Sequence, residues 1–383
     1  MSVTSALGFR SAGVAAGLKS TGKPDVAVVV NDGPDRHAAA VFTANRVAAA
    51  PVHWSRQAVS DGRADAVVLN SGGANACTGA PGFQDTHSTA EHAAALLGIS
   101  AGDVLVCSTG LIGERLPMDR LLAGVQDAVG ALSTEGGPAS AEAIMTTDTV
   151  PKTHAISGEG YTIGGMAKGA GMLAPGLATM LVVITTDAVV APGLLDGCLR
   201  EAVRTTFERA DSDGCMSTND TVILLSSGAS GATPEPQEFQ ERLRAVCADL
   251  ARKLIGDAEG ASHDIAIEVV HAASEQDAEE VGRAVARSNL FKTAIFGKDP
   301  NWGRVLSAVG TTQAAFEPDA LDVAMNGVQI CRRGGIGEPR DLVDLEPREV
   351  HVLIDLHAGE SSATIWTNDL THDYVHENSA YSS

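Results

Sequence analysis

The sequence has few basic residues for its length, and its cysteines form no pair at disulfide or metal spacing. Its 383 residues include 27 Lys and Arg against 48 Asp and Glu, a formal net charge of −21. This balance argues against a nucleic acid or an anionic membrane as partner, because both repel an acidic protein. The six cysteines are scattered without a C-x-x-C pair, which indicates neither a disulfide framework nor a zinc site. We therefore expect a protein of the reducing cytoplasm that acts on small molecules.

Motifs for metal and nucleotide binding are also missing. The sequence contains no H-E-x-x-H, no Cys/His cluster at metal spacing and no G-x-x-x-x-G-K-[ST] loop. The acidic run 208–214 contains Asp-x-Asp-Gly, but it lacks the terminal Glu and the ligand ladder of an EF-hand, so a polar turn is favoured over a calcium site. We expect neither a metal ion nor a cofactor.

Long apolar segments are absent as well. Residues 169–186 carry no charge, but glycines and a proline interrupt the first half of this stretch, which excludes a regular spanning helix. Its second half, 181–186, is a short β-branched run typical of a buried strand. The N-terminal segment lacks the continuous apolar core of a signal peptide. We expect neither membrane insertion nor export.

Short apolar runs alternate with helical patterns along the chain, and 44% of the residues are hydrophobic, which is typical of a globular protein. The runs predict strands over 26–30, 40–43, 66–69, 104–107, 181–186, 221–225, 265–270, 321–325, 350–354 and 363–366. Helical spacing predicts helices over 118–132, 139–145, 193–208, 236–254 and 274–288, and one more that begins at a capping box over 88–91 and ends before Gly98. The predicted class is α/β (α+β), with layered sheets and helices in two or three structural units.

One segment, residues 168–181, has a pattern with chemical meaning. It places Thr179 between a Gly/Pro-rich turn and an apolar strand run. If the peptide bond before Thr179 were cut, its hydroxyl and a new α-amine would share one residue, giving a nucleophile with its own base. Taken alone, the pattern favours a Thr that simply packs in a strand.

Three further segments allow a functional and a structural interpretation. Residues 107–113 end a strand in glycines, which suits either an anion-binding site or an ordinary turn. Residues 145–152 combine three hydroxyls with a carboxylate, which suits either a polar ligand or a capped turn. Residues 298–304 predict a tight turn that packs Trp302.

Together these segments resemble the glutamate N-acetyltransferase (ornithine acetyltransferase, ArgJ) family of arginine biosynthesis. The matching motifs are S-T-G-x-I-G within 107–113, M-T-T-D-T-x-P-K at 145–152, K-G-x-G-M-x-x-P-x-x-A-T-M-L at 168–181, S-T-N-D-T at 217–221, G-x-D-P-N-W-G-R-V at 297–305 and N-S-x-Y-[ST]-[ST] at 378–383. They cover nearly the whole chain in the family's order.

The resemblance implies a self-processing fold of the DmpA/ArgJ-like type. The chain is expected to cut itself between Ala178 and Thr179 into an α chain, 1–178, and a β chain, 179–383. The α chain would supply the oxyanion hole and part of the substrate site, and the β chain the N-terminal Thr and the rest of that site. Two copies of each chain are expected to form an α2β2 heterotetramer.

The resemblance also implies a ping-pong reaction. Thr179 takes an acetyl group from N2-acetylornithine, releases ornithine and passes the acetyl group to glutamate. Its α-amine is the implied base, which suits the chemistry because an α-amino group has a pKa of roughly 8. Some members also use acetyl-CoA, and the residues do not decide whether this chain does.

The site residues carried over by motif fall into two groups. The oxyanion hole would comprise the Thr109 hydroxyl and the Gly110 amide. The implied substrate contacts are Thr146, Lys168, Thr179, Glu259, Asn378 and Ser383. We assign Lys168 to a substrate carboxylate and Glu259 to the side-chain ammonium of ornithine, because each pair has opposite charges.

The sequence departs from the family pattern at three positions. Gly176 stands where many relatives have Asn, Ala258 replaces a Gly, and Ser383 ends the chain where Thr is common. None of these changes removes a proposed reacting group.

Two alternatives remain open. One is an N-terminal-nucleophile amidohydrolase or aminopeptidase, in which water accepts the acyl group. The other is a ligand-binding or assembly protein without enzymatic activity, which would keep its chain uncut.

Overall fold

The computed structural model describes residues 2–172 and 180–380, and these form two compact units. Unit 1 contains the described residues up to Glu208 together with Cys215–Leu254. Unit 2 contains Arg209–Gly214 and the described residues from Ile255 onward. Within the described ranges, no helix combines the length and the apolar character needed to cross a membrane.

Unit 1 contains two β-sheets, and the first has the strand order β1-β2-β4-β5. These strands are Phe9–Val14, Val26–Asn31, Ala66–Asn70 and Val104–Ser108. β1, β2 and β4 pair antiparallel, and β4 and β5 pair parallel. Every residue of β2, β4 and β5 is buried, because both faces of this sheet are covered. That double coverage explains why these strands read as continuous apolar runs.

The second sheet of unit 1 has the order β3-β9-β8-β7-β6. Its strands are His37–Phe42, Thr221–Ser226, Leu181–Thr186, Thr162–Lys168 and Lys152–Ser157. β8 and β9 are parallel, whereas β7 pairs antiparallel with both β8 and β6. A single apolar core joins Val29 and Leu69 of the first sheet to Met166, Val183 and Leu225 of the second, so the two sheets pack face to face.

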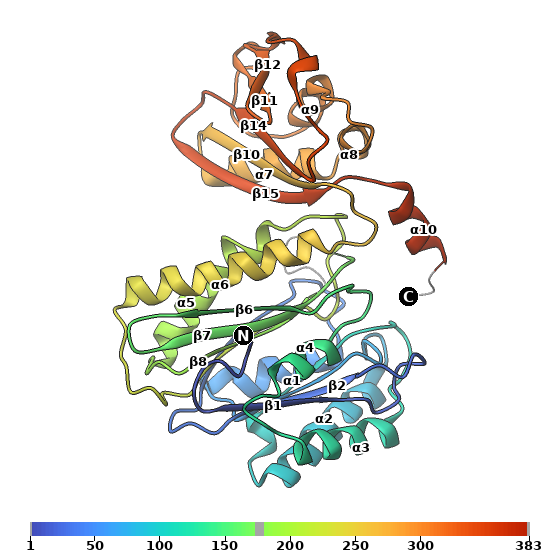
Figure 1. Ribbon diagram of the computed structural model, residues 1–383, viewed down its shortest axis with the longest axis vertical. Helices are drawn as coiled ribbons and strands as arrows, with labels where there is room; N and C mark the ends of the chain where they lie inside the picture. Colours follow the sequence, from blue (N-terminus) through green and yellow to red (C-terminus); the bar gives the residue numbers. More distant parts are fainter. Residues whose placement is uncertain (1, 173–179, 381–383) are drawn as a thin grey trace. The chain divides into compact units, whose positions relative to one another are not determined.

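Helices cover the outer faces of both sheets (Figure 1). α2 (Gly79–Leu97) and α3 (Met118–Gly130) share a core with the outer residues of the first sheet. α5 (Pro192–Arg204) contacts β3 and β9, and α6 (Pro236–Gly256) lies over β7, where Leu250 approaches Gly165. Two shorter helices, α1 (Ala50–Ala58) and α4 (Gly137–Ala143), contact β5 and β1 respectively. Unit 1 is therefore a helix–sheet–sheet–helix sandwich.

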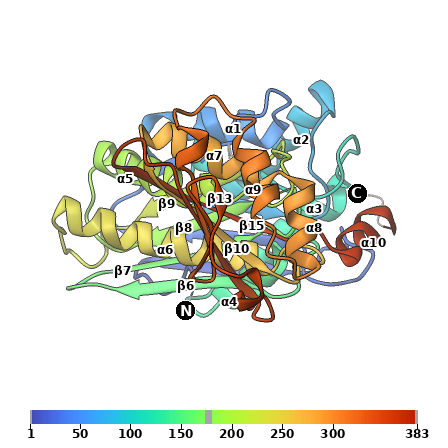
Figure 2. The same ribbon diagram turned by 90° about the horizontal axis from the view of Figure 1, so that it is seen from above.

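Unit 2 is built on a sheet of order β13-β12-β11-β14-β10-β15. The strands are Gly335–Ile336, Val328–Arg332, Asp322–Met325, Glu349–Asp355, Asp264–Ala272 and Ser361–Asn368. The helices α7 (Glu275–Ala286), α8 (Asn289–Phe296) and α9 (Trp302–Val309) contact one another and pack on one face of this sheet (Figure 2). α10 (His372–Ala380) follows β15.

The structure confirms the α/β class and most of the predicted strands, but it corrects the start of one helix. α2 begins at Gly79, and Ser88 of the predicted capping box lies in its middle. Pro81 lies in the first turn of α2, a position where proline is tolerated. The predicted end is correct, because Gly98 adopts a left-handed φ of 69° there.

The segment around Trp302 matches its prediction in part. A tight turn precedes Trp302, with a left-handed φ of 54° at Lys298 and a hydrogen bond from the Asn301 amide to the Asp299 carbonyl at 2.7 Å. The indole itself begins α9, and the Asn301 side chain caps that helix by accepting a hydrogen bond from the Arg304 amide at 3.1 Å. Trp302 does pack against the core of unit 2. The sequence patterns did not predict β1, β6, β7, β12, β13, α1, α8 or α10.

Candidate active site

The predicted oxyanion residues follow the C-terminal end of β5. The Thr109 amide donates to the Asn70 carbonyl of β4 at 3.0 Å, and the Thr109 side chain is buried. Gly110 has a φ of 131°, and a Cβ at this position would lie 2.9 Å from both Cα and N of Gly73. Position 110 therefore requires glycine for two independent reasons. The Gly110 amide donates no hydrogen bond to any residue that the structure describes, which leaves it able to bind an anion.

Lys168 connects this turn to the second sheet. It is the last residue of β7, it pairs with Leu181 of β8, and its side chain is almost fully buried. Its Nζ donates to the Thr109 hydroxyl at 3.4 Å. A buried ammonium requires nearby negative charge, because its desolvation is costly. The ionised carboxylate of Asp148 supplies this charge, and the buried carboxyl group of Asp220 also interacts electrostatically with Lys168.

Asp148 organises the segment that follows α4. One carboxylate oxygen accepts from Lys152 Nζ and from the Gly169 amide, both at 2.6 Å, and the other accepts from the Thr146 amide at 2.9 Å. Burial acts to raise the pKa of Asp148, but Lys168, Lys152 and the Gly169 amide outweigh it and lower that pKa to about 2. The capped-turn interpretation of 145–152 is thus confirmed. The same carboxylate links Thr146 to the lysine-bearing end of β7.

Asp220 is a buried carboxyl group that the sequence reasoning did not single out. It precedes β9 and accepts a hydrogen bond at 2.9 Å from the amide of Met180, the residue after Thr179. Complete burial raises the pKa of Asp220 well above its usual range, although the Met180 amide and Lys168 act in the opposite direction. Its only sequence signal was its place in the S-T-N-D-T motif.

The neighbouring Asn219 has a structural role. Its side-chain amide donates to the carbonyl of Ala74 at 2.6 Å and to that of Ser108 at 2.8 Å. These bonds attach the start of β9 to the end of β5 and to the loop that follows β4. Asn219 thereby supports the turn that carries Thr109.

Unit 2 holds the other two predicted substrate residues that the structure describes. Asn378 of α10 donates to Glu259 Oε2 at 3.0 Å. Gly260 has a φ of 62°, and a Cβ there would clash with the Tyr374 backbone nitrogen at 2.2 Å, so glycine lets this loop approach α10. The Thr371 hydroxyl donates to the Gly260 carbonyl at 2.6 Å, which fastens the loop at the start of α10.

The surroundings of Glu259 are negative. Burial, together with the charges of Glu259 and Asp373, raises the pKa of Glu377 on α10. After burial, the neighbouring charges of Glu259 and Asp373 contribute to this shift, because like charges disfavour the ionised form. The arrangement suits a cationic group.

The structure thus places the predicted residues in two groups. Thr109, Gly110, Thr146 and Lys168 lie together in unit 1, whereas Glu259 and Asn378 lie together in unit 2. Ala178, Thr179 and Ser383 lie outside the described residues.

The predicted α and β chains do not correspond to the two units. β6 and β7 precede the predicted cut, β8 and β9 follow it, and all four belong to one sheet. The main-chain hydrogen bonds between β7 and β8 would join the two chains after a cut.

Comparisons with known proteins identify the family. The model of the ArgJ family matches residues 10–383. This chain belongs to the ArgJ family. The family prediction made from the motifs is therefore confirmed.

Its relatives match over their full length. An ArgJ protein of Streptomyces coelicolor, named arginine biosynthesis bifunctional protein, is 67% identical over 100% of both chains. A protein of the same name from Thermobifida fusca is 65% identical, again over 100% of both chains. Among solved structures, the ornithine acetyltransferase of Mycobacterium tuberculosis complexed with ornithine is 56% identical, with a TM-score of 0.45; the match covers 47% of this chain and 96% of that one.

Proposed function

We propose that this protein transfers an acetyl group from N2-acetylornithine to glutamate, with Thr179 as the nucleophile. It is an acetyltransferase of arginine biosynthesis, as its full-length identity of 67% to an ArgJ protein supports. The geometric observation that carries the proposal is the contact between Lys168 and Thr109. This contact joins the strand that leads into the proposed cleavage segment to the proposed oxyanion turn.

The position of Met180 supports Thr179 as the reacting residue. Met180 directly follows Thr179, and its amide is bound to the buried carboxyl group of Asp220. The next residue, Leu181, pairs with Lys168, whose amine contacts the Thr109 hydroxyl. The chain immediately after Thr179 is therefore anchored beside the groups that the reaction requires.

Self-cleavage comes first in the proposed mechanism. The Thr179 hydroxyl attacks the Ala178 carbonyl, the acyl group moves from nitrogen to oxygen, and water hydrolyses the resulting ester. The products are the α chain 1–178, with a new carboxylate, and the β chain 179–383, with a free α-amine.

Acetyl transfer then uses the same hydroxyl. The α-amine takes the hydroxyl proton while the oxygen attacks the acetyl carbonyl of N2-acetylornithine. The Thr109 hydroxyl and the Gly110 amide stabilise the tetrahedral oxyanion, which is worth about 3 to 4 kcal/mol for each donor. Collapse of this intermediate returns the proton to the departing amine of ornithine and leaves an acetyl-Thr179 ester. The glutamate amine attacks that ester in the second half of the cycle and regenerates the hydroxyl.

The charged residues bind and orient the substrates in this proposal. Lys168 binds a substrate carboxylate, and Thr146 and Ser383 supply further polar contacts. Glu259, whose carboxylate accepts a hydrogen bond from Asn378, binds the side-chain ammonium of ornithine. The negative charges of Glu259 and Glu377 repel each other, and a bound ammonium offsets that repulsion. The proposal also includes an α2β2 assembly that works in the cytoplasm without a cofactor.

One experiment tests the cleavage. Intact mass spectrometry of the purified protein should give two chains of the masses of 1–178 and 179–383, and Thr179→Ala should give one full-length chain. A single uncut chain in active wild-type protein would exclude Thr179 as an N-terminal nucleophile.

A second experiment tests the reaction and separates the alternatives. Acetylornithine with glutamate should yield ornithine and N-acetylglutamate, and Thr179→Ala should yield neither. Release of acetate from acetylornithine at the same rate without glutamate would indicate an amidohydrolase instead. A third mixture, acetyl-CoA with glutamate, tests a second activity, which the word bifunctional in the relatives' names suggests.

A further inference from the structure

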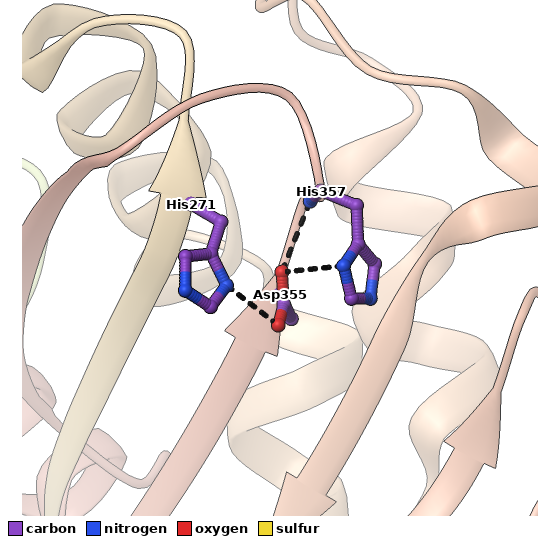
Figure 3. A group of neighbouring side chains, drawn as sticks. All are labelled: His271, Asp355 and His357. Atoms are coloured by element: carbon purple, nitrogen blue, oxygen red, sulfur yellow. Dashed lines mark hydrogen bonds and ion pairs between the residues drawn. The ribbon is translucent and has the colours of Figure 1, made fainter.

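Unit 2 contains a cluster of two histidines around one carboxylate, apart from the residues assigned to acetyl transfer. His271 lies near the C-terminal end of β10, Asp355 ends β14, and His357 follows in the loop before β15. Because β10 and β14 are parallel neighbours, their ends meet at the same edge of the sheet. Figure 3 shows the two imidazoles on opposite sides of the Asp355 carboxylate.

The backbone holds both histidines in position. β10 has a register shift between Val269 and Ala272, and His271 adopts a left-handed φ of 50° within it. The His271 carbonyl accepts from the amides of Ala358 and Gly359 at 2.7 and 2.9 Å, which fastens the loop that carries His357. His357 also has a left-handed φ, 48°, and its amide donates to Asp355 Oδ1 at 3.0 Å.

The hydrogen bond to Asp322 determines which nitrogen of His357 carries a proton. Nε2 lies 3.0 Å from Asp322 Oδ2, and an ionised carboxylate can only accept, so Nε2 is the donor.

This tautomer places a lone pair opposite a second carboxylate. With the proton on Nε2, Nδ1 of neutral His357 faces Asp355 Oδ1 at 3.4 Å. Two acceptors at this distance repel each other unless a proton on Nδ1 or a metal cation lies between them. A histidine that donates one N–H to a carboxylate and presents its other nitrogen to a cation is the usual arrangement around a protein-bound metal.

We propose that Nδ1 of His271, Nδ1 of His357 and the carboxylate of Asp355 bind one divalent transition-metal ion of the zinc or cobalt type. In a tetrahedral site with bonds of about 2.0 to 2.1 Å, neighbouring ligand atoms lie about 3.3 Å apart. Nδ1 of His271 lies 2.8 Å from Asp355 Oδ2, and Nδ1 of His357 lies 3.4 Å from the other carboxylate oxygen, Oδ1. One ligand atom from each of the three residues lies within 4.8 Å of the others. Two imidazoles favour such an ion over calcium or magnesium, which prefer oxygen ligands.

The remaining coordination positions face solvent. The side chains of His271 and His357 are 58% and 43% exposed, so small rotations of the rings can close the site around the ion, and water completes the coordination. Asp322 orients His357 from outside the coordination sphere. The bound ion ties the end of β10 to the loop after β14 and stabilises that edge of unit 2.

Direct metal titration tests the proposal. Untagged full-length protein is treated with a chelator, exchanged into chelator-free buffer and titrated with Zn²⁺ by calorimetry and with Co²⁺ by visible absorption. We expect one ion per full-length chain, or per pair of cleaved chains, and a Co²⁺ spectrum of a nitrogen- and oxygen-ligated ion. Asp322→Asn should weaken binding by about 10- to 100-fold, because it changes the partner that orients a ligand.

Variants separate this site from incidental binding. His271→Ala and His357→Ala should each abolish the stoichiometric binding. His351→Ala is the matched control, because His351 is an exposed histidine of β14 paired with Glu268 outside the cluster, and it should bind like the wild type. If either alanine variant fails to fold, His271→Gln and Asp355→Asn replace it. Absence of stoichiometric binding in the wild type, or unchanged affinity in the His271 and His357 variants, would overturn the proposal. Neither outcome bears on acetyl transfer.

Discussion

Replacing Asp148 by Asn should destabilise unit 1, because it removes the charge that two buried lysines share. The Lys152 and Lys168 side chains are each only 1% exposed, and both stabilise the ionised form of Asp148. Removing one partner of a buried ion pair typically costs about 3 to 5 kcal/mol, since the remaining charge stays buried without compensation.

The pKa of Asp148 gives a second measure of the same effect. It falls from 3.8 to about 2 in the folded protein, which corresponds to about 2 kcal/mol of stabilisation at neutral pH. The value from the pKa is smaller than the cost of breaking the ion pair because it compares only the protonated and ionised forms of Asp148. The substitution by Asn also replaces one carboxylate oxygen, a hydrogen-bond acceptor, by an amide nitrogen. We therefore expect a loss of about 2 to 5 kcal/mol in the free energy of unfolding at pH 7.

The pH dependence has a definite sign. A carboxyl group whose pKa is lowered by folding stabilises the protein above its unfolded pKa, and this contribution disappears as the pH falls through the folded pKa. The difference in stability between the parent protein and its Asp148→Asn variant should therefore be complete above about pH 4 and should shrink towards pH 2.

Chemical denaturation followed by circular dichroism measures the effect. All proteins are made with Thr179→Ala, so that chains of equal length are compared. Asp196→Asn is the control, because Asp196 forms an exposed pair with Arg200 on α5 and should contribute less than about 0.5 kcal/mol. If Asp148→Asn were no less stable than this control at pH 7, the assigned role of the buried charge cluster would be wrong.

Three further changes give separate tests. Gly110→Ala should lower kcat by about 10²- to 10³-fold with little change in KM, because the added Cβ clashes with Gly73 and displaces an oxyanion donor. Gly130→Ala, in α3 with open space around it and no positive φ, should keep nearly full activity, and equal rates for both variants would contradict this assignment. Glu259→Gln should raise the KM for acetylornithine by about tenfold, a loss of about 1.4 kcal/mol, and an unchanged KM would remove the ammonium assignment. Ser274→Ala should cost about 0.5 to 2 kcal/mol in a denaturation experiment, because its hydroxyl caps α7, and an unchanged midpoint would show that water replaces the cap.

The buried strands of unit 1 could be predicted because local composition reports directly on burial. The runs at 26–30, 66–69, 104–107, 181–186 and 221–225 are continuous and apolar, and the structure places a buried strand at each. β7 was missed because its glycines interrupt the apolar pattern. Only the close approach of Leu250 to Gly165 shows why a strand there accepts a residue without a side chain.

The start of α2 shows a second reason why the sequence did not predict every element. Pro81 and Gly82 disfavour a helix locally, yet α2 includes both. A Cβ at Gly82 would lie 1.9 Å from the Thr78 hydroxyl oxygen, so the first turn packs closely against the residue that precedes it. Tertiary and local packing here outweigh intrinsic propensity.

The candidate site likewise has features that the local sequence predicts and features that depend on tertiary packing. By itself, the sequence determined the family, the residue types of the site and the position of Thr179 at the start of an apolar strand, because these depend on the local order of residues. Only the tertiary structure decided that Lys168 contacts Thr109, 59 positions away, that Asp148 joins Thr146 to the end of β7, and that Asp220 binds the Met180 amide. Strand order and register bring these groups together, and neither property can be predicted from the hydrophobic periodicity of a single segment.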